Sequence, residues 1–423
     1  MQLNEEHLRT IASILMKSFM LLSSYSPSGI LWFLTALALN FSCYLCNQSL
    51  NHVLCIKSER AALLRFKTDL IDGANRLSSW SVYNKDCCKW AGVVRNNITG
   101  HVQELHLGGP NDGLHGHCHG SYDMDAEFEA ASKQMLGGNI NPSLMSLKQL
   151  TYLDLSCNDF GGIPIPLFIT SLENLRYLNL STSQFDGQVP EQLGNLTMLR
   201  VLDLRFGLWG SSFPVKNLHW LTNLHELQHL DLSGYDLSDE HNWLQVMTCF
   251  PSLIELRLAS CSLTQIPHHL NTVNFTSLSI LDLSYNSFDS SFMPGWIFNL
   301  TSLISMDLTN CFFHNLVPGV DPGFHKLTSL RFLYVSSNDV MNHSSVLKGV
   351  YRLRNLVSLD MSTCGLSNPV LCDLQNMSSL VSLDLSNNRI VEKLPTSLVN
   401  LCNLRKVDTR SWFPLNECSS RSE

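Results

Sequence analysis

By residue type and spacing, the side chains best suited to chemistry lie in one glycine-rich stretch, "GGPNDGLHGHCHGSYDMDAEFEAASKQML", which begins at Gly108. It holds alternating imidazole and thiol groups followed by carboxylates: His115, His117, Cys118, His119, Asp123, Asp125, Glu127 and Glu129. Imidazole and thiolate are the ligands that Zn²⁺ prefers. A glycine-rich loop offers no second layer of hydrogen bonds to hold such ligands in place. We therefore expect a flexible, solvated loop and no metal site.

No other arrangement of residues predicts catalysis. The chain has no phosphate-binding glycine loop, no nucleophile elbow and no zinc-type His, Glu or Cys spacing. Aspartates recur at one spacing, but a carboxylate in almost every copy of a repeat indicates a structural role. We predict that the chain is not an enzyme and binds no cofactor. The formal net charge of −8 also argues against a nucleic-acid partner.

A repeated frame must position whatever binds. Its clearest copies read "LTYLDLSCNDF" from Leu150, "LSILDLSYNSF" from Leu278 and "LVSLDLSNNRI" from Leu380. The third apolar position of each copy advances in steps of 24 to 28 residues and is occupied by Leu153, Leu178, Leu202, Leu230, Leu256, Leu281, Met306, Leu333, Leu359, Leu383 and Val407. This is the leucine-rich repeat, and such a period is typical of a solenoid.

The pattern L-x-x-L-x-L predicts one short strand per copy. Alternate residues of a strand point to opposite faces, so Leu153 and Leu155 should enter the core while Tyr152 and Asp154 face outward. One copy cannot bury its own leucines, and stacked copies share a continuous core. We therefore predict an α/β solenoid: a right-handed superhelix with a parallel β-sheet on its concave face and a helical N-terminal cap.

The turn after each strand repeats a polar or thiol residue. Asparagine stands there at Asn158, Asn286, Asn338 and Asn388, and cysteine at Cys261, Cys311 and Cys364. A buried asparagine bonds the backbone around such a bend, and cysteine is a small apolar substitute with a weak donor. We interpret these three cysteines as structural.

The segment before the repeats reads "LCIKSERAALLRFKTDLIDGANRLSSW" from Leu54 and "DCCKWAGVVRNNITGHVQELHL" from Asp86. It resembles the N-terminal cap of plant leucine-rich-repeat receptors. Apolar spacing predicts an amphipathic helix there. The resemblance implies a disulfide between Cys55 and Cys87. It also implies a second for Cys88, but Arg95 stands where the partner is expected, so Cys88 is free or pairs with another thiol such as Cys118.

The phrases "LGGNINPSLMSLKQLTYLDLS" and "LENLRYLNLS" are similar to plant receptor-like proteins of the ethylene-inducing xylanase receptor family. That resemblance implies a cell-surface ectodomain in defence signalling, which binds an extracellular protein, peptide or glycan and passes the event to a co-receptor kinase. The alternative is a secreted inhibitor of microbial wall-degrading enzymes, similar to polygalacturonase inhibitors. The corresponding locations are the extracellular side of the cell membrane and the apoplast.

The chain divides by pattern into four segments. Residues 1–46 carry basic residues and the apolar run "ILWFLTALAL", which predict a secretory signal whose N-terminus extends beyond the true start; the alternative is an uncleaved signal anchor, for which the apolar run is short. Residues 51–100 form the cap, 101–408 hold about eleven to twelve repeats with an inserted loop at 108–138, and 409–423 form a non-repeat tail. No closing cap with paired cysteines is evident, which favours a truncated receptor-like protein over a short secreted one.

Sequons support a secreted chain, and several share one repeat phase that should project from the convex side or edge. They are Asn97, Asn179, Asn195, Asn274, Asn299, Asn342 and Asn376.

The concave wall should carry the binding residues. Tyrosine and arginine concentrate energy at interfaces, and variable outward positions hold Tyr152, Arg176, Tyr177, Arg205, Phe206, His229, Arg257, Tyr285, Phe332 and Tyr334.

Overall fold

The computed structural model describes residues 54–110, 131–206, 213–267, 275–289, 292–316, 323–367, 374, 376–390 and 401–410. The predicted signal at 1–46 and the histidine-rich stretch lie outside these residues. The chain separates into two compact units. The smaller comprises Met1–Leu54 and Asn97–Thr99, and the larger comprises Cys55–Asn96 and Gly100–Glu423. The larger unit contains the cap and the described coils.

One sheet of 13 strands runs through the larger unit. Neighbouring strands are parallel except for the antiparallel pair β2–β3. In spatial order the strands are β2 (Val93–Arg95), β3 (Val102–His106), β5 (Tyr152–Asp154), β6 (Tyr177–Asn179), β7 (Val201–Asp203), β8 (His229–Asp231), β9 (Glu255–Arg257), β10 (Ile280–Asp282), β12 (Ser305–Asp307), β14 (Phe332–Tyr334), β15 (Ser358–Asp360), β16 (Ser382–Asp384) and β17 (Lys406–Asp408).

The leucine frame explains this register. Leu153 pairs with Leu178, and Leu178 with Leu202, at the same position of successive strands. Each of these three side chains is fully buried, so the coils share one column of leucines along the core. The predicted solenoid with a parallel sheet is confirmed.

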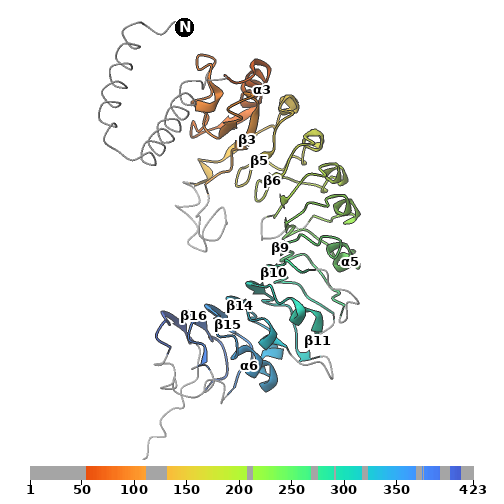
Figure 1. The fold of residues 1–423 in the computed structure, drawn as a ribbon, viewed down its shortest axis with the longest axis vertical. Helices are drawn as coiled ribbons and strands as arrows, with labels where there is room; N and C mark the ends of the chain where they lie inside the picture. The colour runs from red at the N-terminus through yellow and green to blue at the C-terminus, as the bar shows by residue number, and fades with distance from the viewer. Residues whose placement is uncertain are drawn as a thin grey trace, which may run out of the picture. The chain divides into compact units, whose positions relative to one another are not determined.

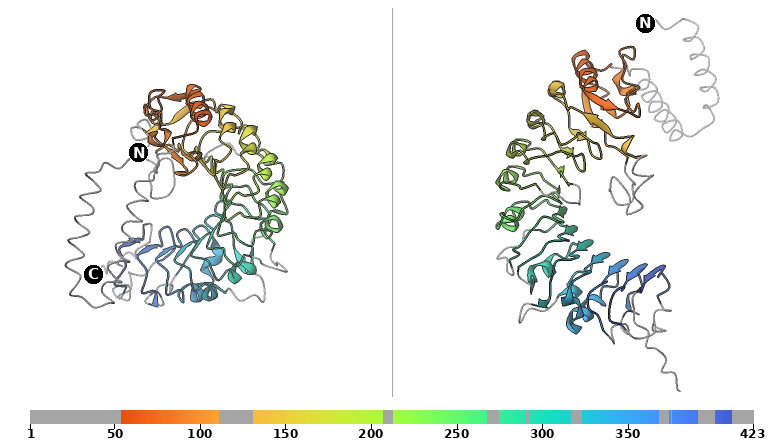
Figure 2. Two further views of the ribbon diagram at one scale, coloured as in Figure 1. Left: turned by 45° about the horizontal axis from the view of Figure 1, so that its top comes forward. Right: turned by 180° about the vertical axis from the view of Figure 1, so that it is seen from behind.

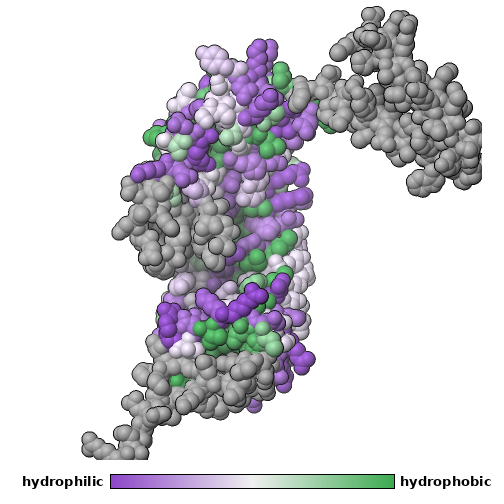
Figure 3. All heavy atoms as spheres, turned by 90° about the vertical axis from the view of Figure 1, so that its left-hand side faces the viewer, coloured by the Kyte–Doolittle hydropathy of each residue, from purple (hydrophilic) through white to green (hydrophobic). Residues whose placement is uncertain are grey.

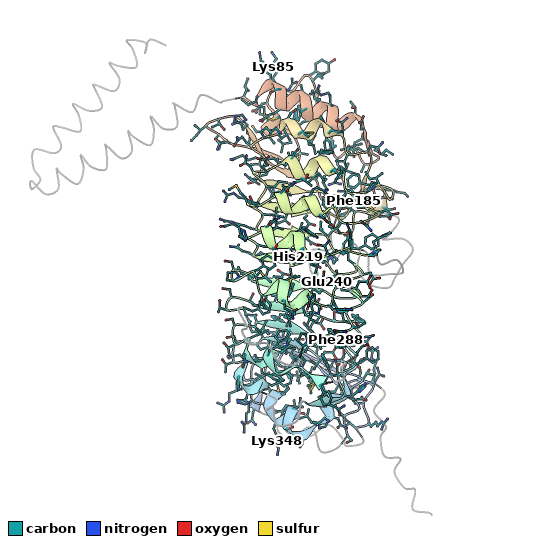
Figure 4. The ribbon with its side chains drawn as sticks, turned by 90° about the vertical axis from the view of Figure 1, so that its right-hand side faces the viewer. Lys85, Phe185, His219, Glu240, Phe288 and Lys348 are labelled. Atoms are coloured by element: carbon teal, nitrogen blue, oxygen red, sulfur yellow. A yellow bond between two sulfur atoms is a disulfide. The ribbon has the colours of Figure 1, made fainter. Side chains whose placement is uncertain are left out.

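Short helices lie on the outer side of the arc that the strands line from within (Figures 1 and 2). They follow one another along the convex side (Figure 4). They are η2 (Pro142–Ser146), η3 (Leu167–Ser171), η4 (Glu191–Asn195), η5 (His219–Asn223), α5 (Trp243–Met247), η6 (Gly295–Asn299), η7 (Phe324–Lys326), η8 (Asp339–Asn342) and α6 (Ser344–Val350). This arrangement leaves the strand-lined inner face open (Figures 1 and 2). A separate parallel pair, β11 (Phe292–Met293) with β13 (Asn315–Leu316), joins two coils beyond the main sheet.

Buried asparagines tie the coils together at the turn after each strand. The side-chain oxygen of Asn286 accepts from the backbone N–H groups of Cys261 and Leu263, both at 3.0 Å, in the preceding coil. Its amide nitrogen donates to the carbonyls of Leu258 and Leu283, both at 2.8 Å. Asn388 repeats the arrangement.

The cysteines at the same position bond the backbone through their thiols. The thiols of Cys261, Cys311 and Cys364 are buried and donate to carbonyls of the preceding coil at 3.2–3.3 Å. Burial raises the pKa of the Cys364 thiol to about 12 and that of Cys311 further. These three groups therefore stay protonated and unreactive, as a structural role requires.

The cap closes the first coil with helix α3 (Lys57–Thr68), whose buried face holds Ala62, Leu63 and Phe66. Buried Glu59 joins this helix to β3, because its carboxylate accepts from the Val102 N–H at 2.8 Å and contacts the His101 ring at 2.7 Å. The apolar face of the cap therefore covers leucines that would otherwise meet water.

The inserted segment ends earlier than 138. Leu136–Gly138 form strand β4, which pairs antiparallel with β1 (Leu70–Asp72) of the cap, and Leu136 is fully buried. The glycine-rich pattern gave no sign of this strand, because its partner lies more than sixty residues earlier in the chain.

A cap arginine completes the asparagine ladder at its first rung. Arg76 donates through Nη1 to the side-chain oxygen of Asn158 at 3.1 Å and to the Gln134 carbonyl at 3.2 Å. Its Nη2 donates to the carbonyls of Leu107, at 3.1 Å, and Gly108. Among the described residues, the Leu136 N–H, at 2.9 Å, is the only backbone donor to the Asn158 side-chain oxygen. The guanidinium therefore supplies the second donor, which is a backbone N–H at Asn286 and Asn388.

Among the described residues, no helix has the length and apolar character that a membrane crossing requires.

Candidate ligand-binding surface

From β5 to β16 the concave wall is built from the first and third residues of each three-residue strand of the main sheet, since the middle residue is buried. Its surface is mostly hydrophilic, with hydrophobic side chains gathered toward the C-terminal strands (Figure 3).

The third position carries the recurring aspartate, and its role is structural. Asp154, Asp231 and Asp360 each accept, through Oδ1, the backbone N–H two residues on, at 2.8–2.9 Å. The same bond recurs at Asp203, Asp282, Asp307 and Asp384. The column therefore stabilises the turns, and recognition of a ligand falls to the positions beside it.

Six of the ten predicted binding residues lie on the wall, half-buried at outward strand positions: Tyr152, Tyr177, His229, Arg257, Phe332 and Tyr334. The other four were wrongly assigned to strands, because each strand has only three residues here. Arg176 precedes β6, Arg205 follows β7, and Tyr285 lies in the turn after β10 with its backbone at φ 57°.

Phe206 is also a correction. Its ring lies edge-on to Phe213 with centroids 4.9 Å apart, and Tyr235 lies 6.0 Å away. It packs against the core and is not an outward residue of the wall.

Three rings stack across neighbouring strands at the N-terminal end of the wall. Tyr152 and Tyr177 lie 3.9 Å apart between centroids at an interplanar angle of 9°, and His106 stacks on Tyr152 at 4.3 Å. His106 also contacts Glu104 at 2.7 Å. Burial, and then the hydrogen bond to Tyr177, raise the pKa of Tyr152 well above its usual range. The Tyr152 phenol therefore remains a neutral hydrogen-bonding group.

His106 was not among the predicted residues, although a signal existed. It stands in register with Asp154, so it occupies the aspartate column of the first coil. A histidine in place of the recurring aspartate indicates that the first coil lacks the bond from the aspartate to the backbone N–H two residues on.

Ion pairs fill the centre of the wall. Glu255 contacts His229 at 3.0 Å and pairs with Arg257, which lies 3.6 Å from Asp282. Burial alone would raise the pKa of Glu255, but the hydrogen bonds and charges of His229 and Arg257 lower it to about 2. Glu255 is therefore ionised, and Arg257 is held facing outward.

Two neighbouring aspartates beside these ion pairs have raised pKa values. Asp203 and Asp231 are in register on β7 and β8. Burial, followed by the charge of Asp203, raises the pKa of Asp231 to about 7, and burial raises the pKa of Asp203 as well. The pair therefore holds a proton near neutral pH.

The disulfide between Cys55 and Cys87 is confirmed, with Cα atoms 5.8 Å apart. Cys88 is free, and its thiol donates to Asp86 at 2.9 Å. Arg95, at the position where the resemblance places a cysteine, lies 3.7 Å from Asp86 instead. Cys157 is also disulfide-bonded, which the sequence pattern did not predict.

Most described sequons lie away from the wall. Asn195, Asn299 and Asn342 are exposed at the last residues of η4, η6 and η8, and Asn97 and Asn376 are also exposed. Asn274 lies outside the described residues. Asn179 departs from the expected convex position, because it is half-buried on β6 and its oxygen accepts from both the N–H and the hydroxyl of Ser181.

Groups of three or more His, Cys, Asp or Glu side chains that could hold a metal ion do not occur within the part of the chain that the structure describes.

Comparisons with known proteins agree with this architecture. The leucine-rich repeat N-terminal domain matches residues 56–94, the leucine-rich repeat region matches 134–332, and a further leucine-rich repeat matches 379–401. The solved ectodomain of the Arabidopsis receptor kinase HAESA, in complex with a peptide hormone ligand, has the same fold. It superposes with a TM-score of 0.61 at 22% identity, covering 83% of this chain and 52% of that one.

Two tomato (Solanum lycopersicum) proteins are similar in sequence. Receptor-like protein EIX1 is 37% identical over 294 residues, and receptor-like protein EIX2 is 35% identical over 298 residues. These matches cover 68% and 70% of this chain. They cover only 27% of each relative, so the chain spans about a quarter of the length of either. The chain belongs to the leucine-rich-repeat receptor-like proteins, a family of non-enzymatic ligand-binding proteins.

Proposed function

We propose that this chain is the ligand-recognition part of a plant receptor-like protein in defence signalling. It binds an extracellular protein, peptide or glycan on the concave wall, and a co-receptor kinase receives the signal. It acts outside the cytosol, at the cell surface or in the apoplast. The Cys55–Cys87 disulfide supports this location, because disulfides persist in oxidising compartments.

The observation that carries the proposal is the stack of His106, Tyr152 and Tyr177 on an open sheet face. Rings that already lie against one another lose little conformational freedom when a ligand arrives, so contact with them is converted efficiently into affinity. The ion pairs at the centre of the wall hold Arg257 ready for a polar partner.

We further propose that Asn97, Asn195, Asn274, Asn299, Asn342 and Asn376 carry glycans. Sugars at the ends of η4, η6 and η8 would leave the wall accessible. Asn179 is the exception among the predicted sites, because its amide is engaged within β6.

The test uses the secreted chain with two probes, a fungal xylanase and a fungal polygalacturonase. We expect one of them to bind without loss of its activity, and Tyr152→Ala with Tyr177→Ala to weaken binding by at least about tenfold, since aromatic anchors contribute about 2 kcal/mol or more. His219→Ala, on the convex helix η5 (Figure 4), is the matched ring-removal control.

Two outcomes would overturn the proposal. Equal loss of binding in the tyrosine variant and in His219→Ala would show that the wall is not the site. Inhibition of either enzyme, without association of a partner kinase, would instead favour the secreted inhibitor.

A further inference from the structure

A second surface lies beside the concave wall, on the flank where the strands of the last coils begin. It is a groove of about 450 Å³ across the coils of β14 to β17. It is lined by Ser329, Arg331, Asn355, Val357, Ser379 and Asn403. All six belong to the residues around the first leucine of each coil, so the groove follows the repeat.

Arginines stand at both ends of this flank. Arg331, Val357, Val381 and Arg405 occupy one column, because each backbone N–H donates to the carbonyl of the preceding member at 2.7–2.8 Å. Adjacent strands lie about 4.8 Å apart, so three steps place the two arginine backbones about 14 Å apart. The small valines between them leave the groove open.

Neither arginine has an acidic partner among the residues that the structure describes. Both are exposed. The Arg331 guanidinium lies 6.0 Å from the centre of the Phe332 ring, which restrains it without neutralising it. The described residues that line the groove include no carboxylate.

The surrounding sequence is basic in an acidic protein. Residues 323–410 contain ten Lys and Arg against six Asp and Glu, a balance of +4, whereas the whole chain has −8. The described aspartates of these strands, such as Asp360 and Asp384, lie at the opposite end of each strand, in the turn column. The last coils as a whole therefore have a positive balance, and on this flank the exposed side chains of Arg331 and Arg405 carry the charge that suits an anion.

The neutral lining suits hydroxyl groups. Asn355 and Asn403 donate their amide nitrogens to the carbonyls of Thr328 and Ser378, each at 2.9 Å. Their amide oxygens accept no bond from the described residues and are available to a ligand hydroxyl. Ser329 and Ser379 add hydroxyls that both donate and accept.

A groove at the same repeat phase in earlier coils lacks this selectivity. It measures about 280 Å³ and is lined by Lys148, Gln149, Ser171, Glu173 and Asn174. Asn174 makes the equivalent bond, to the Lys148 carbonyl at 2.7 Å, but Glu173 opposes an anion there. The basic groove is therefore a property of particular residues and not of the repeat alone.

We propose that the groove along β14 to β17 binds an acidic oligosaccharide, a chain of sugars bearing carboxylates. The coils repeat every 4.8 Å or so, and a sugar ring in an extended chain advances by a similar distance, so successive rings meet equivalent asparagine and serine groups. An extended peptide advances by about 3.4 Å per residue and falls out of step. This site is separate from the aromatic stack and does not depend on the function proposed for it.

The experiment measures binding of oligogalacturonate to the secreted chain, with a neutral malto-oligosaccharide of equal length and a polyglutamate peptide as comparison probes. We expect the acidic sugar alone to bind, with affinity falling as salt is added. Arg331→Gln with Arg405→Gln should weaken it by about tenfold for each arginine, since a charge-assisted hydrogen bond contributes about 1.5–3 kcal/mol.

The matched control is Lys326→Gln with Lys348→Gln, which removes the same charge from helices η7 and α6. Lys348 lies on the convex side (Figure 4). Equal weakening in the two double variants would overturn the proposal, because it would indicate that the sugar is attracted by the positive charge of the protein in general and not by this groove. If polyglutamate binds equally well, the proposal of a sugar ligand is wrong and the groove binds acidic peptides. If the chain is folded, as judged by circular dichroism, and does not bind oligogalacturonate, the proposed site does not exist.

Discussion

Replacing Asn286 with alanine tests whether asparagine and cysteine are equivalent in the turn ladder. Asn286 is fully buried, and its side chain accepts two backbone bonds and donates to the carbonyls of Leu258 and Leu283. It also donates to the Ser284 carbonyl at 3.3 Å, and alanine removes all five bonds. The N–H groups of Cys261 and Leu263 then have no side-chain acceptor in a buried turn.

The magnitude follows from those two donors. A buried polar group left unsatisfied costs about 1–3 kcal/mol, so Asn286→Ala should destabilise its coil by about 2–6 kcal/mol. Cys311→Ala is the matched comparison one coil on. Its thiol donates to the Leu283 carbonyl at 3.2 Å, and that carbonyl keeps its bond from Asn286. The cost should be about 1–2 kcal/mol, mostly from lost packing.

Hydrogen exchange measured by mass spectrometry resolves this locally, because the coils of a solenoid open in part without unfolding the whole. In Asn286→Ala, the peptide containing Cys261 and Leu263 should exchange at least about 30-fold faster, the factor that corresponds to about 2 kcal/mol. A peptide from the β5 coil serves as the internal control. Unchanged protection at Cys261 and Leu263, or an equal effect of Cys311→Ala, would refute the reasoning.

Three further outcomes are expected. Arg76→Ala should destabilise the cap and first coil by about 2–4 kcal/mol, since buried acceptors lose a charged donor. Faster hydrogen exchange confined to the β3 and β5 coils would verify this prediction, and a uniform change along the chain would contradict it. Cys55→Ser should cost about 2–5 kcal/mol in thermal or denaturant unfolding, whereas Cys88→Ser, which removes a free thiol, should cost far less. Burial, and then the negative charge of Asp282, raise the pKa of Asp307 from 3.8 to about 7. The native state therefore binds a proton at Asp307 more tightly than the unfolded chain does. Stability should therefore fall as the pH rises from about 4 to about 7, and Asp307→Asn, which keeps the oxygen that accepts from Thr309 N–H, should flatten that fall in denaturation at pH 4.5 and 8.

The candidate surface was predictable where the repeat sets the position of a residue. Tyr152, Tyr177, Phe332 and Tyr334 were placed on the wall by counting from a leucine. The same counting failed for Arg205 and Phe206, because a strand of three residues ends before them. It also gave no warning that Phe206 turns toward Phe213, since two rings choose each other through packing and not through spacing.

By itself the sequence determined the period, the register of the leucine column and the alternation of asparagine and cysteine at the turns. A repeat makes these local properties, because each coil meets only its neighbours. Tertiary structure alone decided how Arg76 completes the first rung, how β4 joins the cap, and how His106, Tyr152 and Tyr177 stack. Those contacts join segments from outside the repeating pattern, or depend on side-chain conformation, so no periodicity encodes them.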